Sequence, residues 1–140
     1  MIRTGLIIIL LIISQVMQSQ NLKLSVKIEG IEKVKGELRV GLYNNGSNFP
    51  DKKNALTGKV QPIKNNIETV IFDNLKPGIY AVAVIHDENK DGELTTNFIG
   101  IPKEGYGFSN NAMGTMGPPS FEKAAVKMTK NEEIVIQLRN

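Results

Sequence analysis

Ile79-Tyr80-Ala81-Val82-Ala83-Val84-Ile85 is the most apolar stretch after residue 20, and it decides the fold class. It is rich in β-branched residues, which favour strands, and it is too short for a typical helix. A strand that is apolar at nearly every position is covered on both faces. We therefore expect a central, doubly covered strand here.

The segments on either side of this strand alternate between apolar and polar residues. In residues 22–28, Leu or another aliphatic residue occupies every second position, which is the pattern of a strand with one buried face. Turn-forming Asn, Gly and Pro residues separate the segments. The sequence predicts an all-β protein, a seven-stranded Greek-key β-sandwich. The expected strands are 22–28, 38–42, 59–63, 69–72, 79–85, 124–128 and 134–138.

Residues 87–119 show little of the alternation of a strand or the repeat of a helix, and they carry many Gly and Pro residues. An irregular segment of this length is unusual inside a compact domain, and such segments are often functional. We expect one long irregular loop here, and we expect it to be the working surface of the protein.

The N-terminus has the features of a signal peptide. Arg3 precedes an unbroken apolar run, residues 6–13, and polar residues follow at once. The run is far shorter than the roughly 20 residues that span a bilayer. We expect residues 1–19 to be removed, leaving a single domain of residues 20–140 without a transmembrane span, in a secreted or periplasmic protein.

Composition excludes several classes of function. The 17 Lys and Arg residues barely exceed the 14 Asp and Glu residues, and they are scattered, so we expect no nucleic-acid binding. The chain has no Cys and one His, which leaves no cysteine nucleophile and no typical zinc site. No Ser lies in a recognisable nucleophile motif. We therefore expect that the protein is not an enzyme and has no catalytic residues.

One motif carries chemistry. Asp87, Asn89 and Asp91 occupy positions 1, 3 and 5 of a DxNxDG pattern, and Gly92 occupies position 6. This spacing is typical of calcium loops, because alternate side-chain oxygens converge while Gly accepts the sharp bend. Position 12 is Phe98 rather than the usual Glu, so the loop is incomplete unless other oxygens substitute. The candidate ligands are Asp87, Asn89, Asp91, Glu93, Thr95 and Glu104. The alternative is a solvated turn without an ion.

Four further residues are candidates for ligand binding: His86, Phe98, Tyr106 and Phe108. The imidazole could act as an acid or base, or it could be a satisfied residue at a strand end. The aromatic rings could hold a sugar or a peptide, or they could form the small core of their own loop.

Three stretches of the sequence resemble a bacterial family, the domain of unknown function 2141. They are residues 72–81, His86-Asp87-Glu88-Asn89-Lys90-Asp91-Gly92-Glu93-Leu94 and residues 100–111, and the resemblance covers roughly residues 22–139. The Pro77-Gly78 turn into a strand is also similar to transthyretin-like (prealbumin-like) and carboxypeptidase-regulatory-like sandwiches. The resemblance implies a transthyretin-like architecture and no assigned activity.

We expect an exported binding or structural module of the cell envelope, stabilised by calcium, with an envelope or extracellular protein or glycan as its partner. Two alternatives remain open. One is a small hydrolase or other enzyme centred on His86, Asp87 and Glu104. The other is a transthyretin-like carrier of small molecules.

Overall fold

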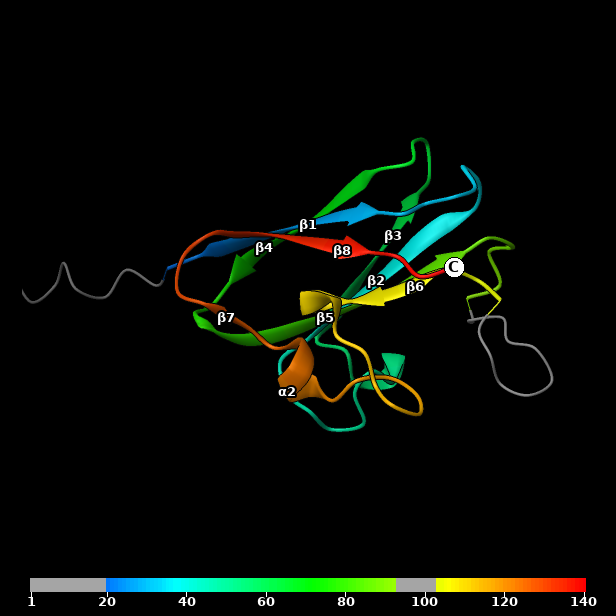
Figure 1. Cartoon of the computed structure of the whole chain (residues 1–140). Coiled ribbons are helices and arrows are strands. Elements are labelled where there is room, and N and C mark those ends of the chain that lie inside the picture. The colour runs from blue at the N-terminus through cyan, green and yellow to red at the C-terminus, as the bar shows by residue number, and fades with distance from the viewer. Residues whose placement is uncertain (1–19, 93–102) are drawn as a thin grey trace, which may run out of the picture.

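The structure is a computed structural model that describes residues 20–92 and 103–140. The expected signal segment, residues 1–19, lies outside the described residues. The described chain is nearly all β and forms two sheets (Figure 1). Its strands are β1 (Leu22–Glu29), β2 (Glu37–Tyr43), β3 (Thr57–Pro62), β4 (Glu68–Leu75), β5 (Gly78–Asp87), β6 (Tyr106–Phe108), β7 (Val126–Met128) and β8 (Glu132–Gln137).

The smaller sheet has the order β4-β1-β8, and its two pairings differ in direction. β1 runs antiparallel to β4 and parallel to β8. The larger sheet has the order β3-β2-β5-β6, and β7 pairs with the first residues of β5. All of the pairings in the larger sheet are antiparallel. β5 is therefore the strand on which the larger sheet is assembled.

A common core fills the space between the sheets, and strand alternation supplies it. Along β1 the buried residues occur at every second position, as the sequence predicts. The inward residues of β2 and β5 alternate in the same way with residues that face outward. The largest buried side chains in this core include Leu24, Ile28, Leu38, Leu42, Phe72, Val82, Val84, Met128 and Ile136.

A second, smaller apolar cluster covers the outer face of β5. Ala81 is fully buried although it faces away from the first core, because Phe108 and Ala124 pack over it. Three short helices belong to this side of the molecule or to its loops: η1 (Lys52–Asn54), η2 (Ser109–Asn111) and α2 (Phe121–Ala124). Figure 1 shows α2 beyond β5, on the side away from β1 and β8. The expectation that β5 is covered on both faces is confirmed over this part of the strand.

The described residues contain eight strands, so the prediction of seven was wrong. The additional strand is β6, which lies inside the segment that we expected to be irregular throughout. It has only three residues, too few for a periodic pattern, and it forms because residues 83–85 of β5 offer a free edge. The Greek-key, transthyretin-like arrangement stays a prediction.

Several boundaries also differ from the expected ones. β4 continues to Leu75, beyond the expected end at residue 72, and its Asn74 adopts a φ of 56° near the strand end. β7 begins at Val126 rather than at residue 124, because residues up to Ala124 belong to the short helix α2. Ser120 caps this helix by accepting a hydrogen bond from the amide of Lys123. Within the described residues, no helix is long and apolar enough to span a membrane.

The core makes a direct prediction about stability. Leu24 is completely buried between the sheets, whereas its neighbour Lys23 is exposed. We expect Leu24→Ala to lower the free energy of unfolding by about 2–5 kcal/mol, because the substitution removes apolar contacts and leaves a cavity. Lys23→Ala is the matched control and should change it by less than about 0.5 kcal/mol. Urea denaturation measures both, and equal losses would contradict the assigned register of β1.

Candidate metal centre

The DxNxDG motif begins at the last residue of β5. Asp87 is completely buried although it is an acid. The chain then turns sharply: Lys90 has a φ of 58° and Gly92 a φ of 82°. Gly suits the second of these positions because a side chain there is strained. The bend therefore falls on the residue that the motif predicts.

The Asp87 carboxylate holds the turn together. Its Oδ1 accepts a hydrogen bond from the amide of Asp91 at 3.1 Å, and its Oδ2 accepts one from the amide of Gly92 at 2.7 Å. Oδ2 also accepts a hydrogen bond from Nε of Arg39 at 2.9 Å. A carboxylate has about four acceptor positions, so an acceptor position remains on Oδ1.

Arg39 connects the turn to the sheet, and sequence reasoning did not identify it. It lies on β2, and its Nη2 donates to Glu37 at 2.6 Å while its Nε donates to Asp87. A lone Arg on the polar face of an alternating strand gives no signal by itself. Only the register between β2 and β5, which pairs Glu37 with Asp87, brings the two groups together.

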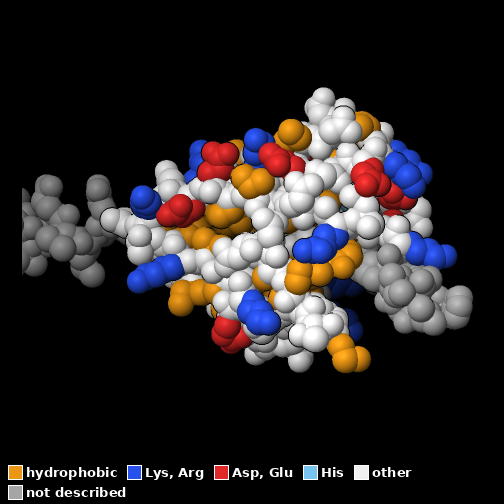
Figure 2. Space-filling view, viewed as in Figure 1, with side chains coloured by type: hydrophobic (Ala, Val, Ile, Leu, Met, Phe, Trp, Pro, Cys, Tyr) orange, Lys and Arg blue, Asp and Glu red, His pale blue; other side chains and the backbone are white. Residues whose placement is uncertain are grey.

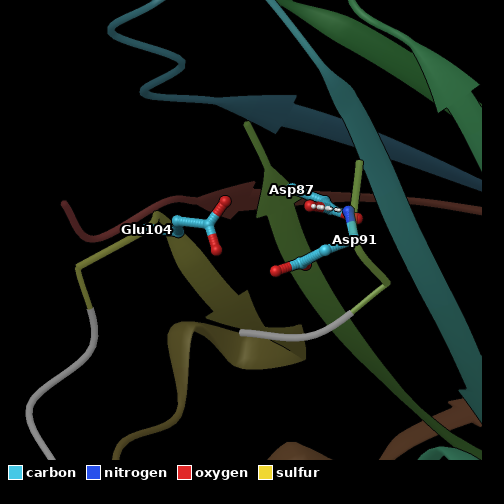
Figure 3. Close-up of side chains that lie close together, drawn as sticks. All are labelled: Asp87, Asp91 and Glu104. Atoms are coloured by element: carbon cyan, nitrogen blue, oxygen red, sulfur yellow. Dashed lines mark hydrogen bonds between the residues drawn. The ribbon is translucent and has the colours of Figure 1, made fainter. Parts of the chain in front are cut away.

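Glu104 folds back toward the turn. It is 5% exposed, and its Oε2 accepts a hydrogen bond from the amide of Glu88 at 2.6 Å, across 16 positions of the sequence. One carboxylate oxygen from each of Asp87, Asp91 and Glu104 lies within 4.8 Å of the others. Figure 3 shows the three carboxylates facing a common space. We call these three residues the carboxylate cluster.

The size of this cluster suits a hard cation. Ca–O bonds reach about 2.6 Å, so two oxygens on the same Ca²⁺ lie at most about 5.2 Å apart. The three oxygens lie within 4.8 Å of one another, which is inside that span. Carboxylates this close repel one another, and a divalent cation removes the repulsion. The amide of Asn89 donates to Asp91 at 3.0 Å, so this side chain also lies at the loop.

Neighbouring cations also offset part of the negative charge. Lys33 forms an exposed ion pair with Glu88 at 3.7 Å, and Arg39 is bonded to Asp87. The turn is thus well formed by its own hydrogen bonds, as the alternative of a solvated turn also requires. Glu93 and Thr95, which are candidate metal ligands, and Phe98, which is a candidate for ligand binding, lie outside the described residues.

His86 faces the other way from Asp87. Successive residues of a strand point to opposite faces, and His86 is 1% exposed on the inner face of β5. Its Nε2 lies 2.8 Å from the backbone oxygen of Lys35. The imidazole thus has a hydrogen-bond partner at a strand end. It is not part of the carboxylate cluster.

The two described aromatic candidates differ in their surroundings. Phe108 is 7% exposed and packs into the outer cluster, with its ring centroid 6.1 Å from that of Phe49. Tyr106 is only partly buried, and its ring lies 6.1 Å from that of Phe108. Phe108 therefore serves the loop's own core, while Tyr106 remains accessible.

The connection before β2 passes close to this turn. Gly36 has a φ of 73°, and a Cβ atom at this position would lie 2.3 Å from the backbone oxygen of Asp87. A side chain cannot be accommodated there without moving the backbone. Gly36 thus allows the connection to pack against the first residues of the motif.

These features define a small β protein of two sheets, with a carboxylate cluster at the end of its central strand. The chain belongs to the family described as an uncharacterized protein conserved in bacteria (DUF2141), which matches residues 26–136. The expected resemblance is confirmed, and the match includes the whole carboxylate cluster. No curated protein and no solved structure matches the chain.

The electrostatics of Asp87 have a consequence for acid stability. Burial by itself favours the neutral acid, but the hydrogen bonds from Arg39 and from the amides of Gly92 and Asp91 outweigh burial and lower the pKa of Asp87. Burial opposes ionisation of Glu68 too, and the amides of Lys64 and Asn65 outweigh it and lower that pKa as well.

A carboxylate with a lowered pKa stabilises the fold above its unfolded pKa, which is about 4, and this contribution is lost as the pH falls through the folded pKa. We expect the free energy of unfolding to rise with pH from acid up to about pH 5. Asp87→Asn should lower it by about 1–3 kcal/mol near neutral pH and reduce this slope. Glu68→Gln should remove a separate part of the slope. Urea denaturation across the pH range measures both, and an unchanged slope in Asp87→Asn would contradict the assignment.

Proposed function

We propose that this protein is an exported binding or structural module of the bacterial cell envelope. We also propose that calcium binds the carboxylate cluster and stabilises that end of the domain. The observation that carries the calcium site is the convergence of Asp87, Asp91 and Glu104. Two of these acids come from a motif with calcium-loop spacing, and the third comes from outside the motif. Glu104 replaces the missing carboxylate from outside the motif.

The role of the ion is structural rather than catalytic. It joins the end of β5 to the residues just before β6, and so fixes both ends of the segment between them. Side chains supply three oxygens here, and Ca²⁺ takes about six to eight, so backbone carbonyls and water complete the sphere. We propose no turnover, because the imidazole of His86 is buried away from the cluster.

The distribution of charge on the surface supports a module without a nucleic-acid partner. Figure 2 shows acidic and basic side chains interspersed on one face of the molecule rather than a single basic patch. Mixed charges of this kind keep a surface solvated and offer little attraction for a phosphate backbone. We propose that the partner is a protein or glycan of the envelope or the extracellular space.

Thermal unfolding in chelator and in a calcium titration tests the calcium site. A bound ion stabilises the native state according to its concentration and Kd, so Tm should rise and saturate. Asp91→Ala and Glu104→Gln should each remove most of this rise. Asp73→Ala is the matched control, because it removes an exposed acid on β4 in the other sheet. A rise that survives in Asp91→Ala and Glu104→Gln would contradict the proposed ligands.

Export is tested by the mass of the protein recovered from the cell envelope. We expect the mature chain to begin at Gln20, because Ser19 is the small residue that precedes the proposed cleavage. Intact-mass measurement distinguishes this species from the full chain. Recovery of the full-length chain from the cytoplasm alone would contradict the proposal.

A further inference from the structure

The edge strands of the two sheets differ in what their outer backbone groups contact. β6 pairs on its outer side with Arg139, and on β8 the amide of Gln137 donates to the side chain of Asn111. On β4, the backbone oxygen of Ile71 accepts a hydrogen bond from the ammonium group of Lys59. Each of these three edges is thus partly closed by another part of the chain.

β3 presents backbone groups on its outer edge. The amide of Ile63 donates to the backbone oxygen of Gly36, and this rung fixes which residues of β3 bond to β2. Backbone groups alternate along a strand, so the odd-numbered residues of β3 bond to β2, whereas Gly58 and Val60 direct their N–H and C=O groups away from it. An edge of this kind is a template for pairing with another strand.

The outer face of this edge is uncharged and uneven. Val60 lies on the outer face because its partner on β2, Arg39, alternates with the buried residues Leu38 and Val40. Val60 is 53% exposed. Two positions earlier, a Cβ atom added at Gly58 would meet only the backbone oxygen of Val40, at 3.5 Å. The edge therefore carries an exposed apolar side chain next to an open position.

The inner row of β3 carries charge, and this charge selects a register. The ammonium group of Lys59 lies 5.6 Å from the centroid of the Phe72 ring, and the amide of Gln61 donates to Glu68 at 3.3 Å. Antiparallel pairing of two copies about Lys59 would place two cations directly opposite each other, which is unfavourable. Pairing about Val60 instead places Lys59 of each copy opposite Gln61 of the other, beside the acid Glu68.

We propose that two copies of this chain associate through antiparallel pairing of β3 with β3, with the two-fold axis at Val60. In this register the amide and oxygen of Val60 bond to those of Val60 in the second copy. The amide of Gly58 donates to the backbone oxygen of Pro62 in the second copy, and the ring of Pro62 lies over the open position at Gly58. β-Branched residues directly opposite each other are favourable cross-strand pairs, so the two Val60 side chains support the contact.

The second sheet lies on the same side of the molecule as this edge. Lys59 reaches the backbone of Ile71, and Gln61 reaches Glu68, so the edge of β4 runs beneath that of β3. Two copies that pair through β3 therefore meet along both layers of the structure. The larger sheets become one antiparallel sheet with the order β6-β5-β2-β3-β3-β2-β5-β6.

Sedimentation of the native protein at concentrations up to about 1 mM tests this dimer, because weak association appears only near its Kd. We expect a monomer–dimer equilibrium. Val60→Lys should weaken it at least about tenfold, because two ammonium groups would meet at the axis. Val135→Lys is the matched control, since Val135 is 44% exposed on another edge strand, β8, and it should dimerise as the native protein does. A native protein that stays monomeric, or equal weakening in both variants, would overturn the proposal.

A second variant tests the backbone pairing itself. Val60→Pro removes an N–H group that faces away from β2, so the ladder between β2 and β3 keeps its bonds. The variant should remain folded by circular dichroism and lose the dimer. A folded Val60→Pro protein that dimerises like the native one would refute pairing at this edge.

Hydrogen exchange locates the interface in the native protein. The amides of Gly58 and Val60 should exchange more slowly as the protein concentration rises, because dimerisation covers them. The amide of Val135, which faces the outer edge of β8, should exchange at the same rate throughout. A dimer that leaves the amides of Gly58 and Val60 unprotected uses another surface and overturns the proposal.

This dimer does not depend on the calcium site, and one variant separates the two. Asp91→Ala should lose the calcium-dependent rise in Tm and still dimerise as the native protein does, because Asp91 lies outside β3. Loss of the dimer in a folded Asp91→Ala protein would contradict the proposed interface. A dimer that forms without any calcium response in the native protein retains the interface and refutes the calcium site.

Discussion

Burial of β5 on both of its faces is the constraint on which the rest of the structure depends. Its inward residues, such as Val82 and Val84, fill the core between the sheets, and its outward Ala81 is buried by a second cluster. The strand also pairs with β2, β6 and β7. Because it is fixed by packing and by hydrogen bonds, its last residue, Asp87, has a defined position from which the turn can start.

The register between β2 and β5 determines which side chains lie beside Asp87. The pairing of Glu37 with Asp87 places Arg39 within hydrogen-bond distance of a buried carboxylate. Arg39 thus connects β2 to the carboxylate cluster, so the geometry of the cluster depends on the register of the sheet.

The sequence predicts those parts of the fold that local pattern controls. Alternation identifies β1, and the apolar run identifies β5, because each has enough residues to show its period. β6 has three residues and depends on a partner strand about twenty positions earlier, so no local sequence pattern predicts it. The same distinction holds at the site. The spacing of Asp87 and Asp91 is visible in the sequence, whereas Arg39 reaches Asp87 only through strand register.

The parallel pairing of β1 with β8 has a consequence for the time at which the molecule folds. It brings the first described strand beside the last one, and the amide of Lys23 is bonded to the side chain of Asn131 across 108 positions. The smaller sheet therefore cannot be completed until the last strand has been synthesised, and contacts of such long range form slowly. Until then β1 lacks its partner on that edge, so the smaller sheet stays incomplete while the chain is being synthesised.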